Sequence, residues 1–417
     1  MTRPRFAWRS VAVLGVAALA LGACGDGGKD SQDGTDEQFE GTLTVGMILP
    51  TTGGLATYGV GMMAAVHTAA EEINAAGGVW GNDVKVLHEN EGPAEEPDVV
   101  AAAADSMIRQ EVNAVIGAAS STASLNIIEA LYNQKIIQVS PSNTGPDFTD
   151  HQFGDYYFRT APSDIIQGSA LAEVIIADGH ATLGILGQQT AYGQGLANQI
   201  ESVYTAGGGE VVYKEFYDLS QTEYSAEIAA LVQADPDAFV LVSYDEARSI
   251  IPALVNAGFS PQDKQFYFVD GNRLDYSEFD EGLMEGTKAT QPIGSTDQSA
   301  LIARVEEYHG DKLPEIAYVP ESYDAMILIA LAAISANTDD PDVLREHMIK
   351  VTNGDNECNT FADCKGLLED GETIAYRGAT GIIWNDKGDP AEATIGIFEY
   401  GADNTYTQID QVIGRME

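Results

Sequence analysis

The side chains best suited to chemistry in this sequence are the hydroxyl groups of two short polar turns. The first turn carries Ser120 and Ser121, and the second carries Ser142 and Thr144. Each turn follows a short apolar run typical of a buried strand, and the first also opens an amphipathic helix. In an open parallel sheet both turns would lie at the edge where ligands bind. Unpaired N–H groups at the start of the helix favour an anion, so a ligand carboxylate would fit there.

A purely structural interpretation of these turns is also open. Serine and threonine often cap helices without binding anything, and for a single turn the capping interpretation would be preferred. Two such turns that converge on one sheet edge favour a binding site.

The motifs of the common enzyme classes do not occur in the sequence. It contains no G-x-S-x-G around a serine and no G-x-x-x-x-G-K-[ST], and Gly193-Gln194-Gly195 lacks the third glycine of a dinucleotide fingerprint. The six histidines are scattered, with none at H-E-x-x-H or H-x-H spacing. We therefore expect no catalytic residues, no metal site and no cofactor. Hydroxyl-rich loops with aromatic residues suit the binding of a small polar ligand.

Apolar runs and amphipathic segments alternate along most of the chain, at the spacing of βαβ units. This pattern predicts a parallel sheet covered on both faces. The order of strand, polar loop, Y-G-x-G, helix and A-G-G occurs first around Tyr58 and again around Tyr192, which predicts a duplication into two similar lobes. The expected strands span 42–49, 84–88, 114–116, 136–139, 182–186, 211–213, 238–242 and 266–269, and the expected helices include 62–76, 97–110, 123–133, 299–309, 323–335 and 342–352.

The predicted fold class is α/β, with two doubly wound, Rossmann-like parallel-sheet lobes joined by a three-strand hinge. A hairpin of 381–384 and 393–400 around a turn at 385–389 would complete the second sheet. The lobes are then discontinuous, and the first crossing falls near residues 158–161. We expect 41–161 plus 291–377 to form lobe 1 and 162–290 plus 378–417 to form lobe 2.

The N-terminal segment has the features of an export signal. Arginines precede an apolar run that is too short to span a bilayer, which predicts a cleaved signal peptide at 1–23. The segment ends in Leu21-Gly22-Ala23-Cys24, which resembles the lipobox of bacterial lipoproteins, in which the cysteine becomes the acylated first residue. Residues 24–40 contain almost no apolar side chain and are expected to form a flexible tether.

The charge and the cysteines narrow the possible partners and the compartment. With 21 basic and 64 acidic residues the net charge is −43, which makes nucleic acid an unsuitable partner. Two cysteines remain besides Cys24, and in an exported chain Cys358 and Cys364 are expected to form a disulfide. The apolar run at 325–334 is too short for a membrane span and is expected to be a buried helix.

Taken together, these stretches resemble the type I periplasmic solute-binding proteins of ABC transporters, in the branch of the leucine/isoleucine/valine-binding proteins. The resemblance covers nearly all of residues 42–400. It is carried by LPTTGGLATYG, EEINAAGGVWG, VIGAASSTAS, VSPSNTGPDFT, QQTAYGQGLA and GIIWNDKGDP.

The resemblance implies a role for particular residues. Ser121 and Thr144 match residues that hold a ligand α-carboxylate, and Ser142 matches one whose backbone carbonyl accepts from the ligand ammonium. Asp270 matches the acidic residue that pairs with this ammonium, although the branched-chain binders carry the longer glutamate. Tyr58 and Tyr192 match aromatic wall residues, and Tyr244 matches a contact from the second lobe. Alternatively, the tyrosines are ordinary interface aromatics and Asp270 belongs only to a turn.

The resemblance also implies what the protein does. We expect an extracytoplasmic, monomeric receptor, anchored to the outer face of the cell membrane by lipidated Cys24. It would bind an amino acid or a close analogue between its lobes and deliver it to an ABC permease. Two alternatives stay open. One is a sensor whose closure signals to a partner, and the other is an α/β enzyme.

Overall fold

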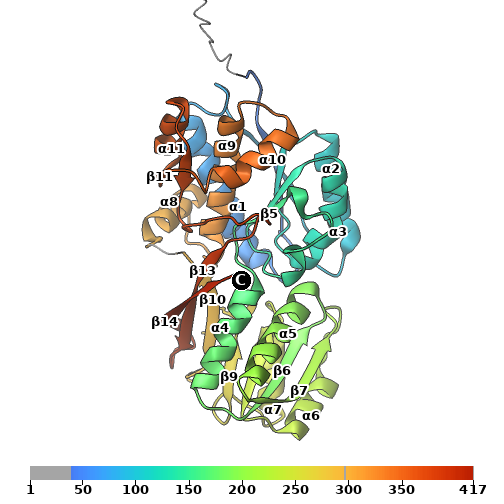
Figure 1. The fold of residues 1–417 in the computed structure, drawn as a ribbon. Helices are drawn as coiled ribbons and strands as arrows, with labels where there is room; N and C mark the ends of the chain where they lie inside the picture. The colour runs from blue at the N-terminus through green and yellow to red at the C-terminus, as the bar shows by residue number, and fades with distance from the viewer. Residues whose placement is uncertain (1–38, 295–296, 417) are drawn as a thin grey trace, which may run out of the picture. The chain divides into compact units, whose positions relative to one another are not determined.

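A computed structural model describes residues 39–294 and 297–416. The predicted signal peptide, Cys24 and nearly all of the predicted tether lie outside the described residues. The first sheet is wholly parallel, in the order β2-β1-β3-β4-β5. Its edge strand β5 is labelled in Figure 1. Its strands are β1 (Thr44–Leu49), β2 (Lys85–Asn90), β3 (Ala114–Gly117), β4 (Ile137–Ser140) and β5 (Tyr157–Arg159).

Helices cover both faces of the first sheet because successive strand residues point to opposite sides. On β1, Met47 belongs to the hydrophobic cluster with α1 and α9, whereas Ile48 belongs to the cluster with α2 and α3. We call this sheet with its helices the first lobe. Its helices are α1 (Ala56–Ala75), α2 (Pro97–Arg109), α3 (Ser121–Asn133), α8 (Ser299–His309), α9 (Val319–Ala336), α10 (Pro341–Lys350) and α11 (Phe361–Glu369).

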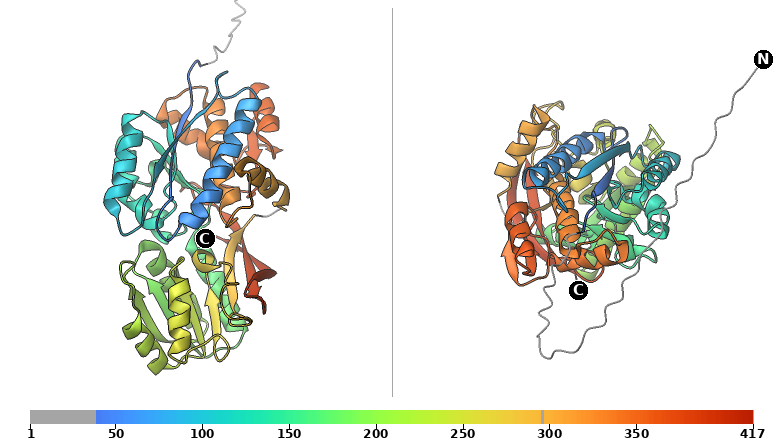
Figure 2. Two further views of the ribbon diagram at one scale, coloured as in Figure 1. Left: turned by 180° about the vertical axis from the view of Figure 1, so that it is seen from behind. Right: turned by 90° about the horizontal axis from the view of Figure 1, so that it is seen from above.

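The second sheet has the order β14-β13-β10-β9-β8-β6-β7, and only the pairs that involve β13 are antiparallel. Its strands are β6 (Thr182–Gln188), β7 (Glu210–Tyr217), β8 (Ala238–Val242), β9 (Gln265–Phe268), β10 (Lys288–Ile293), β13 (Glu392–Tyr400) and β14 (Tyr406–Arg415). Helices α4 (Asp164–Ala177) and α5 (Ala191–Ala206) cover one face, and α6 (Ser225–Ala234) and α7 (Ala247–Asn256) cover the other. We call this assembly the second lobe; Figure 2 shows it from behind and from above.

The predicted duplication is visible in the packing of the two Y-G-x-G segments. Both begin a helix, at the start of α1 and of α5. A Cβ atom on Gly59 would lie 1.8 Å from the carbonyl oxygen of Pro50, and one on Gly193 would lie 2.2 Å from that of Gln188. In both lobes a glycine therefore lets the helix start against the end of the preceding strand, which directs the neighbouring tyrosine to the same sheet edge.

One strand prediction near the C-terminus needs correction, and three strands there were not predicted. The predicted hairpin between 381–384 and 393–400 does not form, because Trp384 makes only an isolated bridge to Pro390. Instead β13 pairs with β14 along nine residue pairs, and β14 forms the sheet edge. Every residue of β14 is at least partly exposed, so its sequence has none of the apolar alternation of a half-buried strand. A small parallel pair, β11 (Asn356–Cys358) and β12 (Ile374–Tyr376), was also not predicted.

The chain passes between the lobes after β5, after β10 and after β12, which agrees with the predicted three-strand hinge. The exact lobe boundaries proposed above remain a prediction. Among the described residues, α9 is long and apolar enough to cross a membrane, but 83% of it is buried inside the protein, as in a core helix. Cys358 and Cys364 lie with their Cα atoms 5.4 Å apart and their sulfur atoms bonded.

Candidate ligand-binding site

A small cavity lies where the strand ends of the two lobes face each other. Its volume is ≈ 20 Å³. Its walls come from the starts of α1, α3 and α5 and from the turns after β3, β4, β8 and β9, as expected for a ligand site in α/β sheets. The wall residues are Leu55, Tyr58, Met62, Ala119, Ser121, Ser142, Tyr192, Tyr244, Asp270, Gly271 and Tyr318.

On the side of the first lobe, the hydroxyl of Ser121 is free to donate into the cavity. Its oxygen accepts from the N–H of Gly145 at 3.3 Å, and no described residue accepts its hydrogen. Ser142, in contrast, donates its hydroxyl to the carbonyl of Ala119 at 3.0 Å. One free hydroxyl donor at the start of α3 is the kind of group that a ligand carboxylate needs.

The start of α3 already holds a carboxylate from the protein itself. Glu91 accepts from the N–H groups of Ala119 at 2.6 Å and of Ser120 at 2.8 Å, and it is 1% exposed. Burial raises the pKa of Glu91 to about 8, while these two N–H groups act to lower it. These two N–H groups, which precede α3, are therefore already bonded, whereas the prediction of an anion at the unpaired N–H groups of the helix itself stays a prediction. The contact was missed because Glu91 lies 28 residues upstream, beyond β2.

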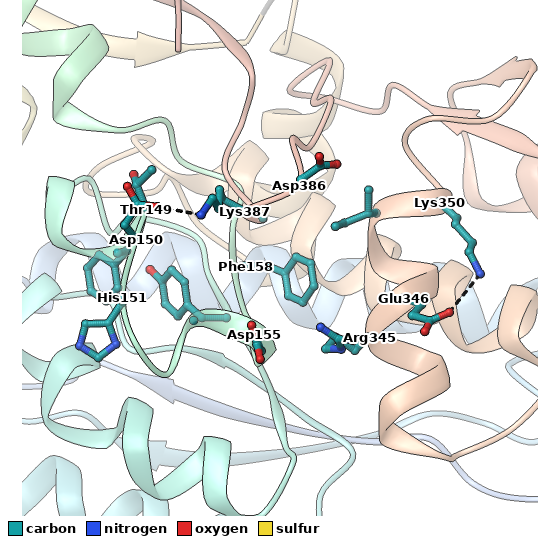
Figure 3. Close-up of a pocket in the computed structure, with 15 residues that line it drawn as sticks. Thr149, Asp150, His151, Asp155, Phe158, Arg345, Glu346, Lys350, Asp386 and Lys387 are labelled. Atoms are coloured by element: carbon teal, nitrogen blue, oxygen red, sulfur yellow. Dashed lines mark hydrogen bonds and ion pairs between the residues drawn. The ribbon is translucent and has the colours of Figure 1, made fainter. Parts of the chain in front are cut away.

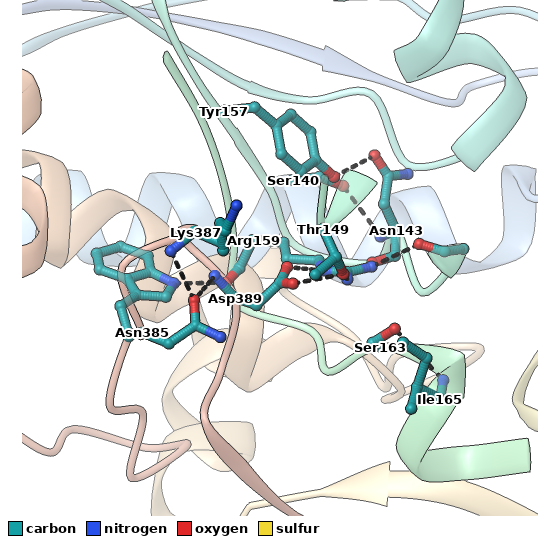
Figure 4. A network of polar contacts seen from close by, with 12 residues as sticks. Ser140, Asn143, Thr149, Tyr157, Arg159, Ser163, Ile165, Asn385, Lys387 and Asp389 are labelled. Carbon is teal, nitrogen blue, oxygen red and sulfur yellow. Dashed lines mark hydrogen bonds and ion pairs between the residues drawn. The ribbon is translucent and has the colours of Figure 1, made fainter. Parts of the chain in front are cut away.

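A buried ion pair fixes the second polar turn. The guanidinium of Arg159 donates to Asp389 at 2.5 Å and to the carbonyl oxygens of Asn143 at 3.2 Å and Gly145 at 2.8 Å (Figure 4). Both charged side chains are almost fully buried, so the pair depends on these additional hydrogen bonds. The result is a rigid turn after β4, anchored to the segment that returns to the second lobe at Asp389.

On the side of the second lobe, Asp270 is 3% exposed and accepts hydrogen bonds from neutral donors. Its Oδ1 atom accepts from Gln167 Nε2 and from the hydroxyl of Tyr192, both at 2.7 Å. Its Oδ2 atom accepts from the hydroxyl of Tyr318, which belongs to the first lobe. No cationic side chain among the described residues pairs with this carboxylate.

The tyrosines of the cavity are neutral donors, and some of them connect the lobes. Burial raises the pKa of Tyr192 and of Tyr318 well above 10, and the Asp270 charge raises both further. The hydroxyl of Tyr58 reaches across to the carbonyl oxygens of Asp270 and Gly271, each at 3.1 Å. Tyr192 and Tyr244 stack with ring centroids 5.4 Å apart and form one wall.

Of the eight residues predicted to bind ligand, the structure brings six together in the cavity wall: Tyr58, Ser121, Ser142, Tyr192, Tyr244 and Asp270. Ser120 instead caps α3 and lines a neighbouring outer pocket, and the Thr144 side chain bonds to Asp164. Tyr318, which comes from the loop before α9, far along the chain, was not predicted. The segment around Tyr318 contains neither a polar turn after a strand nor a Y-G-x-G sequence.

Larger hollows lie outside this cavity among the described residues. One of ≈ 360 Å³ adjoins the cavity and shares Leu55 and Tyr244 with its wall. A second, of ≈ 460 Å³, lies between α4 and β14. A third, of ≈ 480 Å³, lies wholly apart between the 148–158 segment, α10 and the 386–388 turn, where Asp155 and Arg345 face each other (Figure 3). Lys387 pairs with Asp150 and Lys350 with Glu346 there, so most of its charges are already compensated.

Comparison with known sequences identifies the family. A sequence profile described as "Periplasmic binding protein" matches residues 42–366. The chain belongs to the periplasmic binding protein family. The expected type I fold of the leucine/isoleucine/valine-binding branch is confirmed by relatives in sequence and in structure.

Several relatives of this periplasmic binding protein have named ligands. The Leu/Ile/Val-binding protein homolog 1 of Brucella suis is 26% identical over 88% of this chain and 94% of its own length. The isoleucine complex of a branched-chain amino acid binding protein from Streptococcus pneumoniae has a TM-score of 0.72 at 19% identity, covering 90% of this chain and 100% of that one. A solute-binding protein from R. palustris in complex with 4-hydroxybenzoate has a TM-score of 0.73 at 16% identity, covering 89% and 97%.

Proposed function

We propose that this periplasmic binding protein binds a zwitterionic amino acid or a close analogue between its lobes and delivers it to an ABC permease. The observation that carries the proposal is the buried Asp270 carboxylate, which faces the free hydroxyl of Ser121 across one small cavity. A carboxylate buried without a cationic partner is costly, and a ligand ammonium would supply the missing charge. The Ser121 hydroxyl would donate to the ligand carboxylate.

The same carboxylate argues against an aromatic acid as ligand. Structural relatives include a complex with 4-hydroxybenzoate, which has no ammonium group. Placing such an anion beside Asp270 would bring two negative charges together in a nearly closed cavity, where water screens them poorly. Relatives named for leucine, isoleucine and valine support the amino-acid assignment.

Lobe closure is the mechanism that this site supports. Tyr58 and Tyr318 of the first lobe donate to Asp270 and Gly271 of the second, so both lobes build the ammonium end of the site. A ligand that contacts both lobes binds the closed arrangement more tightly than the open one, and this difference drives closure. Import is favoured over sensing because two structural relatives are named as binding proteins of transporters. Both share this fold along nearly their whole length.

Native mass spectrometry of the purified protein, followed by a thermal-shift screen, tests the function. The panel contains leucine, isoleucine, valine, threonine and alanine, with 4-hydroxybenzoate and the matching amines that lack a carboxylate as comparisons. We expect an amino acid to raise the melting temperature and the amines and the benzoate to have little effect. Stabilisation by 4-hydroxybenzoate alone would contradict the proposal.

We also propose that Cys24 is the acylated N-terminus that holds the protein on the outer face of the membrane and that Cys358 and Cys364 are oxidised there. Multiple acyl chains suffice for stable anchoring without a membrane-spanning helix. Cys24→Ser is expected to release the protein from the membrane fraction or to leave the signal peptide uncleaved, as judged by fractionation and mass. Cys358→Ser is the matched control, because it removes a cysteine and leaves the N-terminus intact. Unchanged membrane retention of the Cys24 variant would refute the anchor.

A further inference from the structure

Two buried acceptor atoms beside the cavity lack a hydrogen-bond donor. They belong to Asp164 and Gln167 in the first turn of α4, and both residues are 0% exposed. Asp164 Oδ1 and Gln167 Oε1 have no hydrogen-bond partner among the described residues. Leaving a buried acceptor unpaired typically costs about 1–3 kcal/mol, and more for a charged group. Two such atoms so close in sequence call for a common explanation.

The remaining side-chain polar atoms of both residues are bonded to predicted site residues. Asp164 Oδ2 lies 2.9 Å from the hydroxyl oxygen of Thr144, and the Asp164 N–H donates to the Thr144 carbonyl at 2.7 Å. Gln167 Nε2 donates to Asp270 Oδ1 at 2.7 Å. The first turn of α4 therefore connects the polar turn of the first lobe to the acidic residue of the second.

One proton would satisfy both unpaired atoms. Residues three apart on a helix lie on the same face and can form side-chain hydrogen bonds. Asp164 Oδ1 and Gln167 Oε1 are both acceptors when Asp164 is ionised, but a protonated carboxyl has an O–H donor. With that proton, Asp164 can donate to Gln167 Oε1, and Gln167 remains oriented with its amide nitrogen toward Asp270.

We propose that Asp164 is a neutral carboxylic acid whose proton links Thr144, Asp164, Gln167 and Asp270 into one polar chain that positions Asp270 for the ligand ammonium. The ligand part of this proposal rests on the proposed function. Asp164 acts through Gln167 and is therefore a positioning residue.

The electrostatic surroundings of Asp164 agree with a retained proton. Burial raises the pKa of Asp164 well above its usual range, and the Asp270 charge raises it further, whereas the Thr144 hydroxyl and Arg159 act to lower it. Arg159 itself is paired with Asp389, and the nearby Tyr192 and Tyr318 are neutral phenols. A neutral Asp164 leaves one negative charge at this end of the cavity. This arrangement selects ligands with a single ammonium and disfavours diamines.

Substitution of Asp164 by asparagine or alanine separates this role from simple packing. The amide of Asp164→Asn has an N–H donor for Gln167 and an oxygen that accepts from Thr144, so it imitates the protonated acid. By calorimetry with the amino acid found in the screen, we expect its affinity to stay within about threefold of the native value. Asp164→Ala, which leaves Gln167 without its partner, is expected to bind at least about tenfold more weakly. Glu173→Gln, an exposed position on the same helix, is the matched control.

Infrared spectroscopy tests the proton without any ligand. The native-minus-Asp164→Asn difference spectrum at pH 7 is expected to contain the carbonyl band of a protonated carboxylic acid. Absence of that band, or an affinity loss in Asp164→Asn as large as in Asp164→Ala, would overturn the proposal. If Asp164→Ala does not fold, the asparagine variant and the infrared band still decide. If no amino acid binds the native protein, the proposed function fails, whereas the band continues to report on the proton.

Discussion

At the scale of single residues, the candidate site depends on how one carboxylate is held. Asp270 accepts from Gln167, Tyr192 and Tyr318, and all three donors are neutral. Neutral donors orient a carboxylate and partly stabilise its charge, but they do not neutralise it. The charge therefore remains available to a cationic group that enters the cavity.

Replacing Asp270 with asparagine removes the charge and keeps the size. Breaking one side of a buried charge pair typically costs about 3–5 kcal/mol, so we expect amino-acid affinity to fall by roughly two to three orders of magnitude. Titration calorimetry measures the change. Asp275→Asn, an exposed position five residues later and outside the cavity wall, is the control and is expected to bind normally. Near-native affinity in the Asp270 variant would show that the residue serves only its turn.

Whether the sequence predicts a site residue depends on how far along the chain its partners lie. Ser121, Ser142 and Asp270 directly follow apolar strands, so local pattern places them at the ligand edge. Glu91 and Tyr318 act on groups 28 and 48 residues away, and nothing in their own neighbourhoods indicates it. The direction of the Thr144 side chain, toward Asp164 and away from the cavity wall, likewise depends on tertiary packing.

At the scale of the elements, the start of α5 meets the first lobe more closely than a side chain would permit. A Cβ atom on Gly195 would lie 2.5 Å from Pro146 Cδ, in the short helix that follows the second polar turn. The N–H of Ala191 also donates to the Thr122 hydroxyl at 3.2 Å, across the same contact. Gly195 thus allows close contact between the lobes, whereas Gly193 allows close packing within the second lobe.

Gly195→Ala is expected to separate stability from closure. Alanine is favoured over glycine inside a helix by about 0.5–1 kcal/mol, so the second lobe should not lose stability. In the closed arrangement the new methyl group would collide with Pro146, and such overpacking typically costs about 1–3 kcal/mol. We expect an unchanged or raised melting temperature without ligand and an affinity weaker by roughly 5- to 150-fold.

Gly366→Ala in α11 is the matched control, because a Cβ atom there meets nothing within 4 Å. It should raise helix stability without changing affinity. Equal ligand affinity in the Gly195 and Gly366 variants, measured by calorimetry, would show that the contact with Pro146 does not limit binding.

Element prediction succeeded where the apolar pattern was strong and failed where tertiary pairing decided. The central strands and the alternation of strand and helix followed from buried apolar runs. The β13–β14 pairing did not, since β14 is an exposed edge strand whose register is set by its partner alone. Helix α1 begins at Ala56, ahead of the predicted start. Two glycines in its first turns lower its intrinsic helix propensity, but they do not prevent the helix.

At the scale of the whole molecule, the proposed function requires that two lobes connected by three segments change their separation. The interlobe contacts include several polar ones: the hydroxyls of Tyr58 and Tyr318 donate to Asp270 and Gly271, and Arg273 forms a buried pair with Glu315 at 3.4 Å. They also include the bond from Ala191 to Thr122 and the packing of Gly195 against Pro146. Small polar contacts of this kind can be exchanged for ligand and water at moderate cost.

Small-angle X-ray scattering should therefore report compaction when ligand is added. We expect the radius of gyration to fall at saturating amino acid and to remain unchanged with a compound that does not bind in the thermal-shift screen. Gly195→Ala should show a smaller decrease at equal occupancy. A native radius of gyration that is indifferent to saturating ligand would mean that closure does not accompany binding.

A buried carboxyl beside the hinge links stability to pH. Glu321, in the first turn of α9, is 4% exposed and lines a small cavity with Thr160, Pro162 and Pro292. Burial raises the pKa of Glu321 from 4.5 to about 8, and the nearby Asp324 charge raises it further. The folded protein holds this proton more tightly than the unfolded chain does. The free energy of unfolding is therefore expected to fall as pH rises from about 4.5 to about 8.

Glu321→Gln removes this proton and keeps the shape of the side chain. Melting temperatures measured from pH 6 to pH 9 should fall less steeply for this variant than for the native protein, because one group with a raised pKa is gone. Part of the slope should remain, since Glu91 also has a pKa of about 8 and growing negative charge destabilises so acidic a protein as carboxyls ionise. Glu357→Gln, at an exposed position, should leave the slope unchanged. If the melting temperatures of the native and Glu321→Gln proteins change with pH in parallel across this range, the Glu321 carboxyl ionises as freely in the folded protein as in the unfolded chain.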